Sequence, residues 1–181
     1  MTLLAGEDDA RFHDAIQGLN RGDFSRLEPL FEPRPGFAGK RPQIIEWYDD
    51  GRFSNESKAL TEALTCACFN GKTSVAEYLL KQGVEPSAGA GTGLDALHWA
   101  ANRGQLETVR LLIQSKAPLE SRNMYGGTAL GTAVWSAINE PRPDHLAIIE
   151  ELLAARASRD DVGYPTGDER IDAVFRRHGA A

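Results

Sequence analysis

Cysteine is scarce in this sequence, with Cys66 and Cys68 as the only two among 181 residues. A structural zinc site or a disulfide framework needs more cysteines, or histidines close to a cysteine pair, and neither occurs beside these two. We therefore expect no metal site. Both residues are interpreted as small buried thiols in a reducing compartment, the cytoplasm.

Positive charge and long apolar runs are also limited. Lys and Arg number 20 against 26 Asp and Glu, which gives a net charge of −6, and no basic stripe is visible. Nucleic acid is therefore excluded as the expected partner, because phosphate binding needs such a stripe. The start, MTLLAGEDDA, lacks the features of a signal peptide, and no later stretch is long enough to cross a bilayer. These absences predict a cytoplasmic protein without a membrane partner.

Complete catalytic and phosphate-binding motifs are missing as well. The run at 70–74, NGKTS, looks like the end of a phosphate-binding loop, but Cys66 stands where that loop requires its first glycine. The glycine-rich run at 89–93 resembles a dinucleotide fingerprint only superficially. No Ser/His/Asp set or carboxylate pair lies in a recognisable context, so we predict neither an enzyme nor a cofactor.

A repeated helical hairpin is what the sequence does contain. Its best copy opens at Asp95, a favourable N-cap residue, and continues with a small apolar face that includes Leu97. Gly104 separates this helix from a second one, whose apolar side carries Val109 and Leu112. One such hairpin cannot bury its apolar face alone, so we expect it to stack on copies of itself.

Copies of this hairpin occur at an offset of 33 residues on both sides. The later copy gains seven residues, because its second-helix positions match only at an offset of 40. We expect this surplus in a protruding loop near 137–144, where Pro141 and Pro143 forbid a continuous helix. The matched first-helix sets are Ala63, Leu64, Ala67 and Gly71, then Ala96, Leu97, Ala100 and Gly104, then Ala129, Leu130 and Ala133.

This pattern resembles the ankyrin repeat family, whose units begin a helix with T-P-L-H-x-A and repeat about every 33 residues. The run at 95–100, DALHWA, stands at that helix start, and the run at 123–128, NMYGGT, follows the family's D-x-x-G-x-T hairpin. The resemblance implies an all-α solenoid of stacked helix-turn-helix units with short hairpin loops and divergent end caps. It also implies that His98 bonds backbone groups of neighbouring hairpins.

A single domain over 1–181 is predicted. Within the insertion, Ile44 and Ile45 are expected to pack on the stack, whereas Trp47 and Tyr48 either pack there or belong to a binding site. The predicted parts are a divergent N-terminal repeat at 9–31, an insertion at 32–56, repeats at 57–89, 90–122 and 123–162, and a C-terminal cap helix at 163–181.

The resemblance also implies a concave groove along the hairpin tips and the exposed side of the first helices. Aromatic residues, methionine and arginine occur there, and these types are enriched at the energetic centres of protein interfaces. We predict a monomeric, non-catalytic module that binds a partner protein. For Phe69 and Trp135, packing under neighbouring loops is the alternative. The predicted groove residues are Phe69, Asn70, Thr92, Leu94, Asn102, Arg103, Met124, Tyr125 and Trp135.

Two other functions stay open at this point. An active site or a small-molecule site would form if ionisable groups converged between the 32–57 insertion and the repeats. The candidates for that cleft are Glu46, Asp49, Asp50 and His145. Alternatively, the chain is a regulatory subunit or an inhibitor of a partner enzyme, which the sequence does not distinguish from a binding module.

Overall fold

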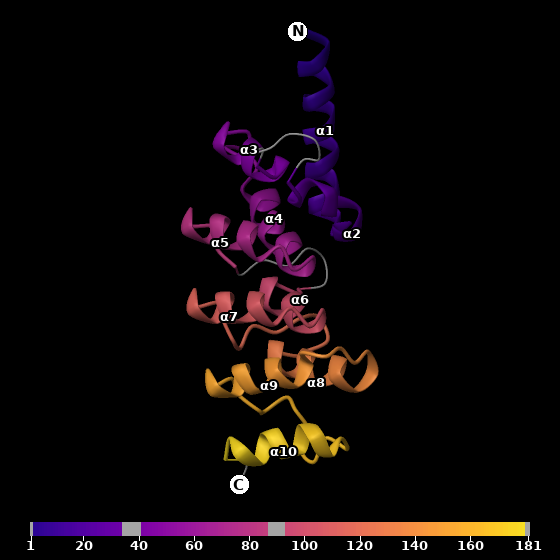
Figure 1. Ribbon diagram of the computed structural model, residues 1–181, viewed down its shortest axis with the longest axis vertical. Helices are drawn as coiled ribbons and strands as arrows, with labels where there is room; N and C mark the ends of the chain where they lie inside the picture. The colour runs from indigo at the N-terminus through magenta and orange to yellow at the C-terminus, as the bar shows by residue number, and fades with distance from the viewer. Residues whose placement is uncertain (1, 34–40, 87–92, 180–181) are drawn as a thin grey trace.

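The computed structural model describes residues 2–33, 41–86 and 93–179, and within these ranges all regular elements are helices. They stack in layers along one axis, with the two termini at opposite ends (Figure 1). The all-α solenoid expected from the repeats is confirmed. Its elements are α1 (Thr2–Arg21), α2 (Phe24–Leu27), the 3-10 turn η1 (Glu28–Phe31), α3 (Gln43–Asp49), α4 (Ser57–Phe69), α5 (Thr73–Lys81), α6 (Ala96–Asn102), α7 (Leu106–Gln114), α8 (Ala129–Asn139), α9 (His145–Ala154) and α10 (Glu169–Arg177).

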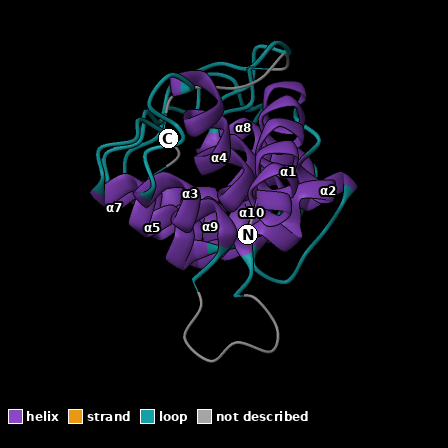
Figure 2. Cartoon of the chain, turned by 90° about the horizontal axis from the view of Figure 1, so that it is seen from above, coloured by secondary structure: helices purple, strands orange, loops and turns teal. Residues whose placement is uncertain are grey.

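Two rows of helices run through the stack. Helices α4, α6 and α8 pack on one another as an inner row, and α5, α7 and α9 form an outer row (Figure 2). The apolar faces of both rows meet in one continuous core, in which Leu97, Leu112 and Leu130 are each 0% exposed. Stacking therefore buries the faces that a single hairpin would leave in water.

The central repeats begin and turn as their sequences predict. The side chain of Asp95 accepts hydrogen bonds from the backbone N–H groups of Leu97 and His98 and so caps α6. Between the two helices of a repeat, Gly71 and Gly104 adopt φ values of +65° and +71°, which L side chains rarely tolerate. The cap and the glycine together set the length of α6.

The N-terminal unit has a longer first helix than expected. Helix α1 begins at Thr2 rather than near residue 9, and the short pair α2 and η1 takes the place of a second helix. Gly22 still has a positive φ of +78°, as the inter-helix glycines of the other repeats do. This unit keeps the turn of a repeat while its helices differ.

The insertion packs against α1. Trp47 on α3 is 1% exposed, and its indole N–H donates to Asp8 Oδ2 at 3.1 Å. Arg52 pairs with the same carboxylate and lies 4.5 Å above the Phe12 ring. Tyr48 is half-buried against the ring of Tyr78. Of the two roles considered for Trp47, packing is therefore the correct one.

The seven surplus residues are shared between a helix and a loop. Helix α8 has 11 residues where α6 has 7, and only 140–144 form the loop before α9. The predicted loop start near 137 is wrong, because Ala137 is 5% exposed and its burial extends the helix. The helix therefore continues to Asn139, about one turn beyond the predicted start of the loop, and ends before Pro141.

The C-terminal cap completes the outer row only. Helix α10 packs chiefly against α9, and its apolar residues Ile171, Val174 and Phe175 are buried, as their spacing predicts. Arg177 reaches Glu150 on α9 at 3.3 Å. In the described part of the chain, no inner-row helix follows α8, and the irregular segment 160–168 lies there instead.

Both cysteines are buried within α4. Each is 0% exposed, and burial raises the pKa of both thiols far above the usual range. The Cys66 thiol lies 3.7 Å from the carbonyl oxygen of Phe24, to which it donates. The interpretation as buried structural thiols is confirmed, since a protonated thiol in the core is neither a nucleophile nor a metal ligand.

Glu62 is an unusual member of the core. It is 1% exposed on α4, and its Oε2 atom has no hydrogen-bond partner among the described residues. Burial raises its pKa from 4.5 to about 7, and Lys58 offsets this only in part. The fold therefore favours the protonated acid. The raised pKa of Glu62 adds to the free energy of unfolding below pH 4.5, and this addition is lost as the pH rises towards 7.

We expect Glu62→Gln to raise the free energy of unfolding by about 1–3 kcal/mol at pH 8, because the amide has no charge to bury. At pH 4 the two proteins should be nearly equal in stability. Urea denaturation at both pH values measures the difference. The control is Glu85→Gln, since Glu85 is exposed and its substitution should change little. A gain of equal size at both pH values would contradict the proposed ionisation.

Candidate interaction surface

A buried Asp95–His98 pair ties the central repeat to the hairpin that follows it. His98 Nδ1 lies 2.8 Å from Asp95 Oδ1, and His98 Nε2 lies 3.1 Å from the carbonyl oxygen of Gly127. Burial alone lowers the pKa of His98, but the hydrogen bond and charge of Asp95 raise it above 6.5 overall. Both ring nitrogens therefore donate. The backbone-bonding role that the resemblance implied for His98 is confirmed.

The hairpin at 123–128 is closed by its first residue. Asn123 Oδ1 accepts from the backbone N–H of Tyr125 at 2.9 Å and of Gly127 at 3.1 Å. Gly126 has a φ of +81°, which allows the tight turn. Met124 and Tyr125 project from it with exposed fractions of 65% and 79%. The predicted tip residues are thus held on a turn that Asn123 fixes through two backbone N–H groups.

Phe69 and Arg103 lie together at the ends of neighbouring inner helices. The Phe69 ring centroid is 5.7 Å from that of Phe24 and 5.0 Å from that of Trp99, both edge-on. The guanidinium of Arg103 lies 4.7 Å above the same ring. Phe69 and Arg103 are half-buried. For Phe69, packing between repeats accounts for most of the ring, while Arg103 covers its remaining face.

The two predicted asparagines link successive repeats. Asn70 Nδ2 donates to the carbonyl oxygen of Phe24 at 3.1 Å, and Asn102 Nδ2 donates to Ser136 Oγ at 2.9 Å. The backbone oxygen of Asn102 accepts from His145 Nε2 at 3.1 Å. Sequence position alone did not indicate these partners, because they come from other repeats. Both side chains are half-buried and engaged within the stack.

The other two residues predicted at the hairpin tips are Leu94 and Thr92. Leu94 is 9% exposed, so its assignment to the exposed tip is wrong. The reason is its place directly before the buried cap Asp95, where the chain has already turned into the stack. Thr92 and the glycine-rich run at 89–91 lie outside the described residues.

Trp135 borders an open hollow beside the end of the inner row. Its side chain is 53% exposed, so the loop at 140–144 does not bury it. The hollow has a volume of about 330 Å³. One wall is a helical stripe of α8 and the other is the segment that precedes α10. The lining residues are Gly131, Val134, Trp135, Ile138, Asn139, Asp161, Val162, Gly163, Pro165 and Thr166.

The groove predicted from the sequence omits one exposed apolar residue that lines this hollow. Ile138 on α8 is 45% exposed and lines the hollow, and it is missing from the predicted groove. Ile138 was expected in a loop rather than at the end of α8, which explains why it was overlooked. The signal that was available is its spacing of three residues from Trp135, which places both on one side of a helix.

The family of ankyrin repeats, described in three copies, matches residues 64–162, which is more than half of the chain. The chain belongs to the ankyrin repeat family. A mouse protein, Protein fem-1 homolog A-like, is 31% identical to it over 99 residues. This match covers 55% of the present chain and 14% of the relative, so the ankyrin chain spans a small part of that protein's length. Ankyrin repeats are in general protein–protein interaction modules.

The ionisable groups considered for an active site fall on two elements of this ankyrin stack, with Glu46, Asp49 and Asp50 at α3 and His145 at the start of α9. Asp49 on α3 bonds the hydroxyl of Tyr78 and the guanidinium of Arg41. His145 is buried at the start of α9, where its Nδ1 accepts from the backbone N–H of Arg142 at 3.1 Å. Burial lowers the pKa of His145, so a neutral ring serves this structural role. Helices α3 and α9 lie in different layers (Figure 1), so His145 does not share a cleft with Asp49.

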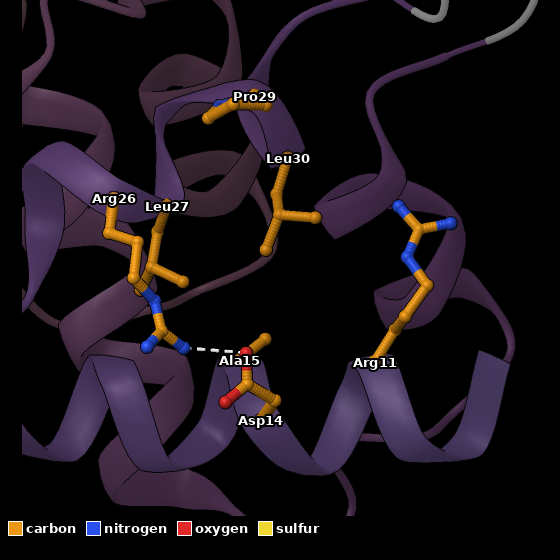
Figure 3. Close-up of a pocket in the computed structure, with 7 residues that line it drawn as sticks. All are labelled: Arg11, Asp14, Ala15, Arg26, Leu27, Pro29 and Leu30. Carbon is orange, nitrogen blue, oxygen red and sulfur yellow. Dashed lines mark hydrogen bonds and ion pairs between the residues drawn. The ribbon is translucent and has the colours of Figure 1, made fainter. Parts of the chain in front are cut away.

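A smaller hollow of about 140 Å³ lies between α1 and the α2–η1 turn of the ankyrin stack (Figure 3). Arg26 donates to Asp14 at 2.5 Å across one side, and Arg11 borders the other side. Leu27 and Leu30 supply apolar walls. Because Asp14 compensates the charge of Arg26, this hollow offers a mixed surface rather than a strong anion site.

Neither a metal centre nor a membrane span is present in the described ranges of the ankyrin chain. No three potential ligands from His, Cys, Asp and Glu lie close enough there to hold an ion. The helices there also lack the combination of length and apolar character that crossing a bilayer requires.

Proposed function

We propose that this ankyrin repeat chain is a non-catalytic module that binds a partner protein through its concave groove. The groove is defined here by Phe69, Arg103, Met124, Tyr125 and Trp135. The observation that carries the proposal is the exposure of three large apolar side chains, 65% for Met124, 79% for Tyr125 and 53% for Trp135. Large apolar side chains left in solvent favour interaction sites.

The scaffold supports such a role because the groove is held before any partner arrives. Asn123 fixes the tip turn through two backbone N–H groups, and His98 anchors the same hairpin at Gly127. Binding then costs little ordering of the main chain, so contact energy is retained as affinity. Arg103, stacked on Phe69, presents hydrogen-bond donors at an already ordered position.

A cytoplasmic location and a monomeric state belong to the same proposal. Buried free thiols at Cys66 and Cys68 suit a reducing compartment. If the partner is an enzyme, the same surface would make the chain its regulatory subunit or inhibitor. Identification of the partner distinguishes these roles.

The test begins with a photo-crosslinking amino acid at Met124, which is exposed at the tip. A captured partner is then purified, and its affinity is measured by calorimetry. We expect Tyr125→Ala and Arg103→Ala each to weaken binding about tenfold or more, as truncation of an interface anchor does. The melting temperature should change little for Tyr125→Ala, because that side chain is 79% exposed.

The matched control is Glu77→Ala on the outer helix α5, where the side chain is exposed. It should bind the captured partner as the wild type does. Undiminished affinity in the Tyr125→Ala, Arg103→Ala double variant would reject the groove. Equal loss in the Glu77→Ala variant would point to the outer face instead.

A further inference from the structure

The inner row ends at α8. One side of this helix therefore lacks the neighbouring repeat that covers the same side of α6. On α6, His98 reaches Gly127 and Asn102 reaches Ser136, so this side of the helix is closed by the next repeat. The residues 33 positions later, Gly131 and Trp135, occupy the same places on α8. They face a hollow of about 330 Å³ in place of a helix.

The hollow combines apolar walls with a single charged group. Val134 and Ile138 come from α8, and Val162 and Pro165 come from the opposite segment. Asp161 is the only charged residue among those that line it. A side chain that fills this space must therefore be apolar along its length, and any charge that it carries meets a carboxylate.

The carboxylate of Asp161 is held in place. Its Oδ2 accepts from the backbone N–H of Thr128 at 2.6 Å, and its Oδ1 accepts from the Thr128 hydroxyl at 3.2 Å. Gly131 makes room for it, because a Cβ atom there would lie 2.6 Å from Asp161 Oδ2. In the described residues, neither Asp161 nor the exposed Asp160 takes part in a salt bridge. The charge of Asp161 contributes to the raised pKa of the buried His98, but no Lys or Arg of the described ranges pairs with it.

We propose that the hollow receives an arginine side chain of the partner protein. This inference rests on the proposed function, since it assigns one subsite of the same groove. The methylene chain packs against Val134 and Ile138, while the guanidinium stacks on the half-exposed indole of Trp135. Asp161 and Asp160 supply the opposite charge, and a planar guanidinium suits both a ring face and a carboxylate.

Other occupants fit these observations less well. An acidic side chain or a phosphate would face the carboxylate of Asp161, with Asp160 next to it in the chain. A purely aliphatic side chain would fill the volume but leave the charges and the indole face unused. Preference for an uncharged side chain is therefore an outcome that the test must be able to show.

The experiment compares two probes that share a shape but not a charge, N-acetyl-arginine methylamide and N-acetyl-citrulline methylamide. Each is added to the full-length ¹⁵N-labelled chain, and the indole N–H resonance of Trp135 is followed, with Trp135→Phe assigning the signal. We expect the arginine probe to shift this resonance saturably. The citrulline probe should bind about tenfold more weakly, since its hydrogen bonds to the carboxylates lack the charge.

Asp161→Asn should remove the preference between the probes, because the amide keeps an acceptor for Thr128 but loses the charge. If Asp161→Asn does not fold, Asp160→Asn provides a second variant, for which the preference should fall. The control is Asp144→Asn, an exposed residue of the neighbouring loop, which should keep the preference. Equal binding of both probes, or no Trp135 shift with either, overturns the proposal.

The outcomes separate this inference from the proposed function. If Tyr125→Ala and Arg103→Ala weaken partner binding while the probes show no charge preference, only the arginine subsite is wrong. If the arginine probe binds at Trp135 while those two variants bind the partner normally, the subsite is real but the groove has been misassigned.

Discussion

Asp95→Ala is expected to lower the free energy of unfolding by about 3–5 kcal/mol, the range found when one partner of a buried charged pair is removed. Asp95 is 2% exposed and is the acceptor for four groups. Its loss uncaps α6 and leaves the His98 ring without the carboxylate that raises its pKa. The four donors are the backbone N–H groups of Leu97 and His98, His98 Nδ1 and Ser121 Oγ.

Urea denaturation followed by circular dichroism measures this loss, and Asp95→Asn is the matched variant. The asparagine oxygen still accepts from the backbone of α6, whereas the charge that favours the His98 imidazolium is removed. We expect a smaller loss of about 1–2 kcal/mol for it. Equal losses in the two variants would mean that the hydrogen bonds to the backbone contribute nothing beyond the charge. No loss in Asp95→Asn would mean that the charge contributes nothing, contrary to the raised pKa of His98.

Leu112→Ala is expected to cost about 2–5 kcal/mol, because it leaves a cavity where the outer and inner rows meet. Leu112 on α7 is 0% exposed. Helix α7 packs against α6 in its own repeat and against α5 and α9 in the neighbouring repeats. The cavity therefore weakens contacts on both sides of the central layer as well as within it.

The control is Leu111→Ala, at the adjacent position of the same helix. Leu111 is half-buried, so part of its side chain is already in water in the folded state, and the expected cost is about 1 kcal/mol. Helix propensity is the same in both substitutions and cancels from the comparison. Similar losses for Leu111 and Leu112 would contradict the placement of the core between the rows.

Hydrogen exchange gives a second measurement for the same pair of variants. Stacked repeats contact mainly their neighbours, so a cavity in one layer can open that part of the stack before the rest. We expect amides of α7 and α9 to lose protection in Leu112→Ala more than amides of α1. Uniform loss along the whole chain would indicate that the stack unfolds as one unit.

The two buried histidines, His98 and His145, show how burial and hydrogen bonding divide one residue type between two protonation states. Beside Asp95, His98 donates from both nitrogens, and its pKa is raised despite burial. His145 accepts from a backbone N–H at Nδ1 and donates to Asn102 at Nε2, and its pKa is lowered. Neither ring is available for chemistry, because both are 1% exposed and bonded to the scaffold.

The helices and their stacking were predictable from the sequence because they depend on local signals that recur in each unit. Asp95 caps its helix, Gly104 turns the chain, and the leucines at 97, 112 and 130 meet in one core. Each signal acts through neighbours a few residues away, or through the same position in the next copy. A period of 33 residues is therefore sufficient to predict the rows.

The exposure of the groove residues was decided by the tertiary structure. Phe69 and Trp135 occupy equivalent repeat positions, 66 residues apart. Phe69 is enclosed by aromatic rings and Arg103, whereas Trp135 is 53% exposed. The difference arises because a side chain on an inner helix is covered by the adjacent layer, and the layer beyond α8 contains a loop. What covers a residue depends on the next layer, which its own repeat does not encode.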